Sequence, residues 1–316
     1  MTEEALQARV AWLYYMEGLT QAEIAGRLGL TRLRINRLLG DARDSGLVRV
    51  TLNSRFAGCV ELEARLRTEL GLRDAVIVPT PEDLDQVALQ IGRATADFIS
   101  RLLMERAVHR IGVGWGATLR EAVRHVQPAA YPSLSVHSMM GGLTHGLEIN
   151  TFEIAAALAR RLDAQCKYLA APLYAGSAAS RDTILQQDVF RDIFEAIADV
   201  DVALMGVGDL SRRSLLIRYG LPSDVTAQDL RAHGAVGDLL GTFLKANGAP
   251  VDHDLNRRVI APSIEVLRKI PTMIVASGGR NKVHVLAAVL RARLASVLIC
   301  DEQTAAAALA LVREAS

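Results

Sequence analysis

Cysteine is scarce in this sequence, and long apolar runs are missing from it. The three cysteines, Cys59, Cys166 and Cys300, lie far apart and form no CxxC pair, so neither a disulfide framework nor a metal site is indicated. No apolar run approaches the roughly 18 residues of a membrane helix, and the start MTEEALQ lacks the basic segment of a signal peptide. We therefore expect a cytoplasmic protein with reduced thiols and no membrane span.

Net charge is also low. A formal net charge of +1 excludes a molecule that binds polyanions over its whole surface, so any affinity for nucleic acid must come from a local excess. Half of the residues are hydrophobic, and 316 residues exceed what one core usually holds. The interruption NSRFAG at residues 53–58 predicts two domains, 1–54 and 55–316, the second of which opens with a linker helix at 55–72.

The segment LTQAEIAGRLGLTRLRINRLLGDARDSG, residues 19–46, is the most informative part of the chain. Thr20 and Glu23 have the spacing of a capping box, which predicts a helix over about 21–28. Gly29 then supplies the left-handed residue that a tight turn between two helices needs.

A second helix is predicted from about Arg32 to Ser45, capped by Thr31 and ended by Gly46. Its apolar residues recur at helical spacing and predict one inward face, formed by Ile35, Leu38, Leu39 and Ala42. This arrangement is typical of a helix-turn-helix, with the second helix in the major groove of DNA. The alternative is an ordinary helical hairpin with scattered arginines.

The outward surface of this motif suits DNA. Arginine reaches guanine edges or phosphates, asparagine pairs with adenine, and an apolar side chain contacts a thymine methyl. From Thr20 to Arg55 there are seven arginines against three acidic residues, which favours phosphate contact. The alternating segment Leu47–Arg55 predicts a strand that forms a wing or leads out of the domain. The predicted DNA-binding residues are Thr20, Gln21, Thr31, Arg32, Leu33, Arg34, Asn36 and Arg37.

After the boundary, short β-branched runs alternate with helical patterns. Strands are expected around AVIVP, RIGVG, LSVHSM, KYLAAPLY, VDVALMG, PTMIVA and SVLIC, with helices near 84–107, 119–126, 152–162, 184–198 and 282–293 and a last one from residue 304. This order predicts an α/β domain with a mostly parallel sheet covered on both faces. A ligand then lies beyond the carboxyl ends of the strands.

Glycines cluster where these strands end. The segment GVGWGAT, residues 112–118, closes one strand and opens a helix whose first N–H groups are free to hold an anion. Lys282 follows another glycine pair, at a helix start, and is expected to supply the cation. The spacing GxGxG is not the dinucleotide fingerprint GxGxxG, and no P-loop is present. The further glycine pairs at strand ends are Gly141 and Gly142, Gly206 and Gly208, and Gly278 and Gly279.

Residues 237–258 are expected to form a hairpin excursion beside the strand ends, with its turn at Asn247-Gly248. The polar residues Asp238, Asn247, His253, Asp254 and Asn256 are either hydroxyl-binding groups or ordinary turn residues. For His253 turn chemistry is favoured. The remaining histidines show no ligand spacing, and no Ser-His-Asp arrangement is present.

Together, LTQAEIA, GVGWGATL, MGVGD, GDLLGTF, VASGGRNK and LICDEQTA resemble the SorC/DeoR group of sugar-binding transcriptional regulators, in the same order and from about Val10 to the C-terminus. The opening RVAWLYYMEGLTQ is most similar to polyol-catabolism members. The resemblance implies an effector domain similar to the sugar-phosphate isomerase and CoA-transferase fold, a phosphorylated sugar or polyol as effector, no cofactor, and a homo-oligomer, usually a tetramer. It places the effector on Gly114, Trp115, Gly116, Ala117, Thr118, Gly141, Gly142, Gly206, Gly208, Asp238, Asp254 and Lys282.

Three functions remain open at this point. The first is a ligand-responsive transcription factor that binds double-stranded operator DNA and is not an enzyme. The second is a sugar-phosphate isomerase-like enzyme with an appended helix-turn-helix, although the sequence shows no acid and base pair at a strand end. The third is an architectural DNA-binding protein whose large domain only oligomerises.

Overall fold

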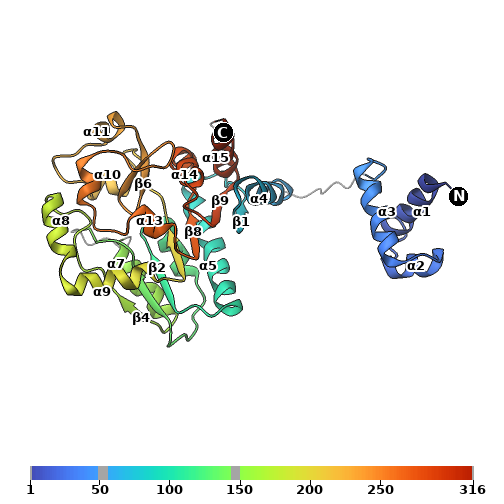
Figure 1. Cartoon of the computed structure of the whole chain (residues 1–316), viewed down its shortest axis with the longest axis horizontal. Helices are drawn as coiled ribbons and strands as arrows, with labels where there is room; N and C mark the ends of the chain where they lie inside the picture. The colour runs from blue at the N-terminus through green and yellow to red at the C-terminus, as the bar shows by residue number, and fades with distance from the viewer. Residues whose placement is uncertain (1, 49–55, 144–149, 315–316) are drawn as a thin grey trace. The chain divides into compact units, whose positions relative to one another are not determined.

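The computed structural model describes residues 2–48, 56–143 and 150–314. The chain divides into two compact units, Met1–Ala57 and Gly58–Ser316 (Figure 1). Among the described residues, no helix has both the length and the apolarity to cross a membrane.

The first unit contains three helices, α1 (Glu3–Tyr15), α2 (Gln21–Leu28) and α3 (Arg32–Asp44). They pack around a small core to which each contributes, with Val10, Ile24 and Ile35 fully buried. The helix-turn-helix predicted from the sequence is confirmed.

The capping predictions for this unit are also confirmed. The backbone N–H of Thr20 donates to Glu23 Oε2 at 2.8 Å, and that of Glu23 donates to the Thr20 hydroxyl at 3.3 Å, which completes the capping box. The hydroxyl of Thr31 accepts from the N–H of Arg34 at 3.2 Å. Gly29 and Gly46 take positive φ values of 65° and 76°, which glycine adopts without steric cost. The strand predicted over Leu47–Arg55 falls, from residue 49 on, outside the described residues.

The second unit is built on a seven-stranded sheet and a two-stranded hairpin. The sheet contains β1 (Asp74–Val78), β2 (Arg110–Val113), β3 (Ser135–Ser138), β4 (Gln165–Lys167), β5 (Val202–Met205), β8 (Thr272–Ala276) and β9 (Val297–Asp301), and the hairpin is β6 (Ala235–Leu239) with β7 (Thr242–Lys245). The longer helices are α4 (Ala57–Leu70), α5 (Val87–Glu105), α6 (Ala117–His125), α7 (Thr151–Arg161), α8 (Ala178–Leu185), α9 (Asp188–Ala198), α14 (Val283–Arg291) and α15 (Glu302–Glu314). The short ones are η1 (Leu84–Gln86), α10 (Leu215–Tyr219), α11 (Ala227–Ala232), α12 (Asp254–Arg258), α13 (Ile264–Leu267) and η2 (Arg280–Lys282).

All neighbouring strands of the large sheet are parallel, in the order β1-β9-β8-β5-β2-β3-β4. From β2 the chain continues outward through β3 and β4, whereas from β5 it continues in the other direction through β8 and β9. The connections therefore diverge between β2 and β5, which makes a topological switch point there.

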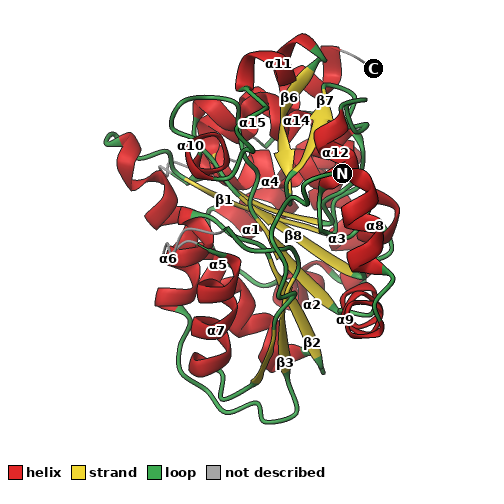
Figure 2. Ribbon diagram, turned by 90° about the vertical axis from the view of Figure 1, so that its left-hand side faces the viewer, coloured by secondary structure: helices red, strands yellow, loops and turns green. Residues whose placement is uncertain are grey.

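Helices cover the sheet on both faces (Figure 2). Side chains alternate between the faces of a strand, and in β5 Ala203 and Met205 join one core while Val202 and Leu204 join the other. Helices α5, α6 and α7 form the core on one side, and α4, α14 and α15 contribute to the core on the other. The near-continuous burial of β5, β8 and β9 follows from this two-sided cover. The predicted α/β fold class is confirmed.

Two predicted elements are wrong in detail. The run KYLAAPLY is not a strand beyond Lys167: residues 168–175 form only isolated bridges, one of them between Pro172 and Gly142. The helix predicted over 184–198 is two helices, since Gln187 takes an extended conformation between α8 and α9.

The excursion at residues 237–258 has two turns where the sequence predicted one. The hairpin itself turns at Leu240-Gly241, which have φ values of 52° and 80° and so match the twist of the paired strands. The Leu240 side chain is buried, which explains why an apolar residue occupies this turn. The predicted Asn247-Gly248 turn follows, closed by a 2.8 Å bond from the N–H of Gly248 to the Lys245 carbonyl.

Candidate functional site

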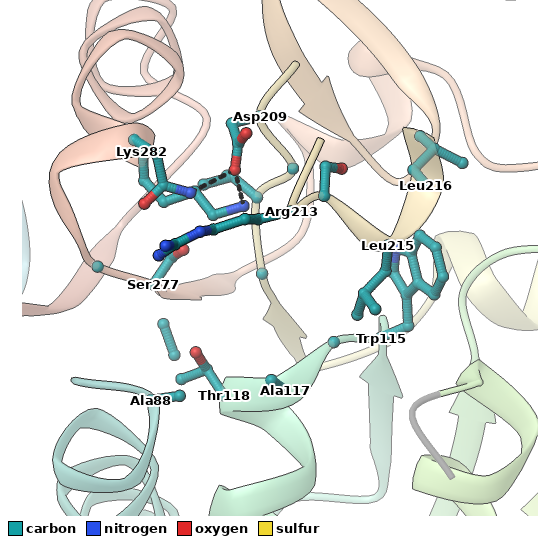
Figure 3. A pocket seen from close by; sticks show the side chains of 18 residues that line it. Ala88, Trp115, Ala117, Thr118, Asp209, Arg213, Leu215, Leu216, Ser277 and Lys282 are labelled. Atoms are coloured by element: carbon teal, nitrogen blue, oxygen red, sulfur yellow. Dashed lines mark hydrogen bonds and ion pairs between the residues drawn. The ribbon is translucent and has the colours of Figure 1, made fainter. Parts of the chain in front are cut away.

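A cavity of about 280 Å³ opens at the switch point of the large sheet. Its wall comes from the segments that follow β2, β5 and β8 and from the first residues of α6 and η2 (Figure 3). The lining residues are Ala88, Trp115 to Thr118, Gly206 to Asp209, Arg213 to Leu216, Ala276 to Gly278, Asn281 and Lys282. Crevices at this position are where open parallel sheets bind small ligands.

The cavity exposes the start of α6. Gly116 is the N-cap residue and has no side chain to accept from the first-turn N–H groups, so no side-chain cap closes this end. Its φ of 118° favours glycine, and no heavy atom lies within 4 Å of the position that a Cβ would take. Helix N-termini carry partial positive charge and free N–H donors. The arrangement can therefore hold an anion.

Asp209 lies on the wall of the cavity opposite the start of α6 and contacts several neighbouring polar groups (Figure 3). Its Oδ2 lies 2.8 Å from Nζ of Lys282 and 2.5 Å from Nδ2 of Asn281, and its Oδ1 accepts from the N–H of Ser211 at 2.6 Å. Burial acts to raise the pKa of Asp209, but the Lys282 ammonium and the hydrogen bonds from Lys282 and Ser211 outweigh it and lower that pKa. Asp209 is therefore an ionised carboxylate with a satisfied set of partners.

A second carboxyl lies behind the cavity wall. The backbones of Asp238 and Gly208 exchange two hydrogen bonds of 2.9 and 3.0 Å, which attach the β6–β7 hairpin to the segment after β5. Asp238 Oδ2 accepts from the N–H of Gly241 at 3.0 Å, whereas Oδ1 is buried without a partner among the described residues. Burial raises the pKa of Asp238 to about 6. Only glycine fits at position 208, because a Cβ there would lie 1.9 Å from Asp238 Oδ1.

Among the predicted effector residues, the structure brings seven together on the described wall of this cavity: Trp115, Gly116, Ala117, Thr118, Gly206, Gly208 and Lys282. The five others lie outside it. Gly114 packs under Leu240 and Met205, and Asp238 sits behind Gly208. These two belong to the layer that supports the wall.

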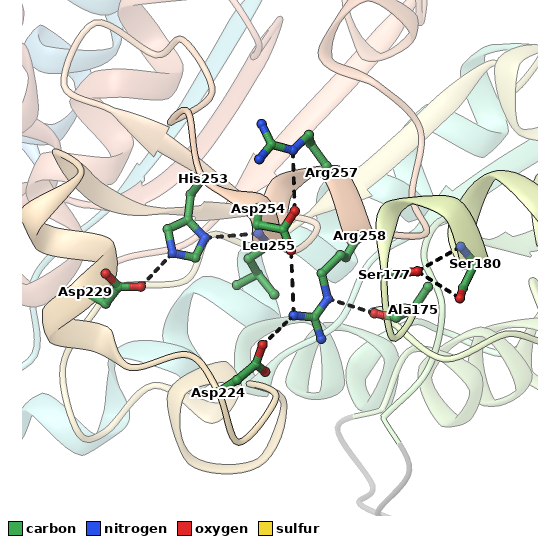
Figure 4. Close-up of polar contacts among 10 residues, drawn as sticks. All are labelled: Ala175, Ser177, Ser180, Asp224, Asp229, His253, Asp254, Leu255, Arg257 and Arg258. Carbon is green, nitrogen blue, oxygen red and sulfur yellow. Dashed lines mark hydrogen bonds and ion pairs between the residues drawn. The ribbon is translucent and has the colours of Figure 1, made fainter.

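The remaining three predicted residues have structural roles elsewhere. The N–H of Gly141 donates to the Ile260 carbonyl, and a Cβ on Gly142 would collide with the Phe152 ring, so both glycines permit close packing after β3. Asp254 is exposed and pairs with Arg257 and Arg258 (Figure 4). The sequence predicted Gly141 and Gly142 at the ligand because glycine pairs follow several strands, whereas Asp254 was placed there by the family resemblance alone.

Five polar wall residues were missed: Asp209, Arg213, Ser214, Ser277 and Asn281. Asp209 and Ser277 directly follow glycine or strand residues that were identified, so their position after a strand end was a usable signal. Arg213 stands in a loop with no motif, and only the fold brings it to the cavity.

A further polar group surrounds the start of α12. His253 Nε2 lies 2.6 Å from Asp229 Oδ2, while its Nδ1 accepts from the N–H of Leu255 at 3.0 Å (Figure 4). Although ligand atoms of Asp229, His233 and His253 lie within 4.8 Å of one another, this bonding leaves neutral His253 no free ring lone pair for a metal. His253 is the N-cap residue of α12, which is a structural role, as the sequence favoured when it assigned His253 to turn chemistry.

In the first unit, the predicted DNA-binding side chains are exposed or half-buried. Leu33 is 80% exposed, which is unusual for an apolar side chain of a merely solvated helix. Arg34 is paired with Glu3 at 2.6 Å, and Gln21 donates to Asn36 at 3.3 Å. Thr20, Gln21 and Arg32 also line one hollow together with Tyr14, which the sequence did not single out.

Comparison with known proteins agrees with this architecture. Residues 54–310 match the model of the sugar-binding domain family. The chain is 34% identical over 314 residues to the transcriptional regulator LsrR of Escherichia coli K12, covering 98% of this chain and 96% of that one. LsrR of Enterobacter sp. strain 638 is 32% identical over 317 residues, with 98% and 94% covered.

The chain belongs to the SorC/DeoR group of sugar-binding transcriptional regulators.

Solved structures agree with this assignment. The full-length sorbitol operon regulator SorC from Klebsiella pneumoniae superposes with a TM-score of 0.73 and 26% identity, over 97% of this chain and 98% of SorC. A DeoR family regulator from Listeria monocytogenes, 24% identical, shares the fold with a TM-score of 0.72 over 79% of this chain and 98% of its own. For a member of this family, the cavity at the switch point is the natural candidate for the sugar site.

Proposed function

We propose that this regulator binds operator DNA through α3 and that a phosphorylated sugar or polyol in the cavity controls this binding. The observation that carries the proposal is the uncapped N-terminus of α6, which opens into a cavity that also contains Arg213 and Lys282. Backbone donors and a cationic side chain that meet in one cavity match the dianionic phosphate group.

The rest of the cavity suits a small polyhydroxy compound. Its volume of about 280 Å³ is at the lower limit for ligand pockets. Asp209, Asn281 and Ser277 offer side-chain hydrogen-bond groups, while Trp115, Leu215 and Leu216 provide apolar surface. This mixture of a few polar groups on an apolar wall supports a sugar or polyol as the organic part of the effector.

DNA binding is supported by α3. Asn36 and Arg37 are exposed on it, and these are residue types that contact base edges and phosphates. One helix-turn-helix makes a small interface, and specific affinity normally requires two half-sites. We therefore include a homo-oligomer, a tetramer by family resemblance, in the proposal.

The ionisable residues that line the cavity favour a regulator over an isomerase. An isomerase needs an acid and a base of tuned pKa near the sugar carbonyl. Among the described lining residues Asp209 is the one carboxylate, and its pKa is lowered by Lys282 and Ser211 against the effect of burial. A carboxylate held in its ionised state by an ion pair is poorly suited to exchange protons.

A thermal-shift screen over sugar phosphates, polyol phosphates and their dephosphorylated forms tests the proposal. A compound that binds the native state at 100 times its Kd adds about 2.7 kcal/mol of apparent stability. The compound that raises the melting temperature should then change the affinity of the protein for DNA upstream of its own gene. If the stabilising compounds leave DNA affinity unchanged, the control function is wrong, since coupling requires differential binding to two states.

A further inference from the structure

The two cationic side chains of the cavity are not equivalent. Lys282 is largely buried, with 18% of its side chain exposed, and its Nζ forms a 2.8 Å ion pair with Asp209, whose side chain is 5% exposed. The same carboxylate is held by Asn281 and Ser211. The negative charge of Asp209 lies beside Lys282 and cancels most of its electric field. A second anion is therefore attracted only weakly to this lysine.

Arg213 has no such partner. Its side chain is exposed, and among the residues that the structure describes its guanidinium forms no ion pair or hydrogen bond, while its backbone N–H donates to the Ser211 hydroxyl at 3.2 Å. In Figure 3 the side chain extends from the loop after β5 into the cavity, with its guanidinium end beside Ser277. The available positive charge therefore lies with Arg213 and the α6 N-terminus.

We propose that Arg213, with the first N–H groups of α6 and the Ser277 hydroxyl, holds the phosphate of the effector, while the Asp209–Lys282–Asn281 group binds its hydroxyls. This inference rests on the proposed function and divides the site into two parts. The guanidinium fork matches phosphate oxygens in a bidentate geometry. A carboxylate that already accepts from an ammonium and an amide repels phosphate and suits hydroxyl donors.

Loss of each part should have a different effect. Arg213→Ala removes the charged contact and should weaken binding of a sugar phosphate about 10- to 100-fold, while binding of the free sugar changes little. The double variant Asp209→Asn with Lys282→Gln removes both charges of the pair and keeps the net charge of the cavity. It should weaken the free sugar and the sugar phosphate by similar factors, so that the preference for the phosphorylated form remains.

The experiment is calorimetric titration of the full chain with ribose and ribose 5-phosphate, erythritol and erythritol 4-phosphate, and inorganic phosphate as competitor. Arg212→Ala is the matched control, because this exposed arginine is adjacent in sequence but does not line the cavity. Arg213→Lys should restore part of the preference for phosphate. A melting curve for each variant verifies that it is folded.

The outcomes separate this inference from the function on which it rests. Loss of phosphate preference in Arg213→Ala but not in Arg212→Ala supports it. Wild-type affinity of Arg213→Ala for the sugar phosphate, with loss in the double variant, overturns it and assigns the phosphate to Lys282. If the wild type binds free and phosphorylated sugars equally, the inference fails while sugar binding stands. If it binds none of these probes, the proposed effector class fails as well.

Discussion

The side-chain amide of Gln21, at the start of α2, donates a 3.3 Å hydrogen bond to Oδ1 of Asn36 on α3. Oδ1 keeps a second lone pair and Nδ2 keeps its two hydrogens, so Asn36 can still pair with the edge of an adenine. The bond joins the two helices of the motif and fixes the direction in which the Asn36 amide points.

Replacing Asn36 by alanine should weaken specific DNA binding. Loss of a bidentate contact to a base costs about 1–3 kcal/mol, and Asn36 is exposed, so the melting temperature should not change. Fluorescence anisotropy at fixed salt with DNA from upstream of the gene measures the effect. Random-sequence DNA is the control and should bind as before, since phosphate contacts are retained. Equal affinity of wild type and variant for the specific DNA would show that α3 is not the reading helix.

Gln21→Ala should weaken DNA binding through Asn36. Its effect should therefore be smaller in the Asn36→Ala background than in the wild type, and a double-mutant cycle should give a coupling energy of about 0.5 kcal/mol or more. Additive effects of the two substitutions would mean that Gln21 acts on DNA independently.

The protein is expected to be a homo-oligomer. Val60 on α4 is 53% exposed, and this apolar side chain stands on the helix that the sequence predicted as a linker. Light scattering at micromolar concentration should give a mass above that of one chain, and Val60→Asp should lower it if α4 lies in an interface. A monomeric mass for the wild type would contradict the oligomer, and an unchanged mass for the variant would remove α4 from the contact.

Gly208→Ala should damage the cavity. The added Cβ would lie 1.9 Å from Asp238 Oδ1, so the buried Asp238 carboxylate, the segment after β5 or the hairpin must move. Overpacking of this kind costs about 1–3 kcal/mol, and effector affinity should fall with it. Gly176→Ala is the control, because no heavy atom lies within 4 Å of the Cβ position there. Denaturant unfolding of both variants measures the difference. Equal free energies of unfolding would show that the cavity wall accommodates the added Cβ without loss of stability.

Asp238→Asn should change how stability depends on pH. Burial raises the pKa of this carboxyl from 3.8 to about 6, so the folded protein keeps its proton at pH values where the unfolded chain has lost it. Between about pH 4 and pH 6 the native state binds more protons, and the contribution of Asp238 to stability falls as pH rises. Asparagine cannot ionise, and its carbonyl can still accept from Gly241. The stability of the variant relative to wild type should thus rise across this range, by up to about 3 kcal/mol. If the free energy of unfolding of the variant differed from that of the wild type by the same amount at pH 4, 5 and 6, the prediction would be wrong.

Local signals in the sequence were sufficient to predict the helix-turn-helix. The capping pair Thr20 and Glu23 and the turn residue Gly29 act within three or four residues of themselves, and such interactions do not depend on the rest of the fold. For the same reason the uncapped start of α6 at Gly116 and the position of Lys282 at the start of a helix could be predicted.

Tertiary structure decided which strand ends share a cavity. The sequence shows that strands end in glycines, but the order β8-β5-β2 is set by packing among segments more than 60 residues apart. That order brings Gly206 and Gly208 to the cavity and leaves Gly141 and Gly142 as packing residues. It also pairs Lys282 with Asp209 and brings Arg213 to the same wall. Ion pairs between distant segments follow from the fold, because no local pattern encodes which charges meet.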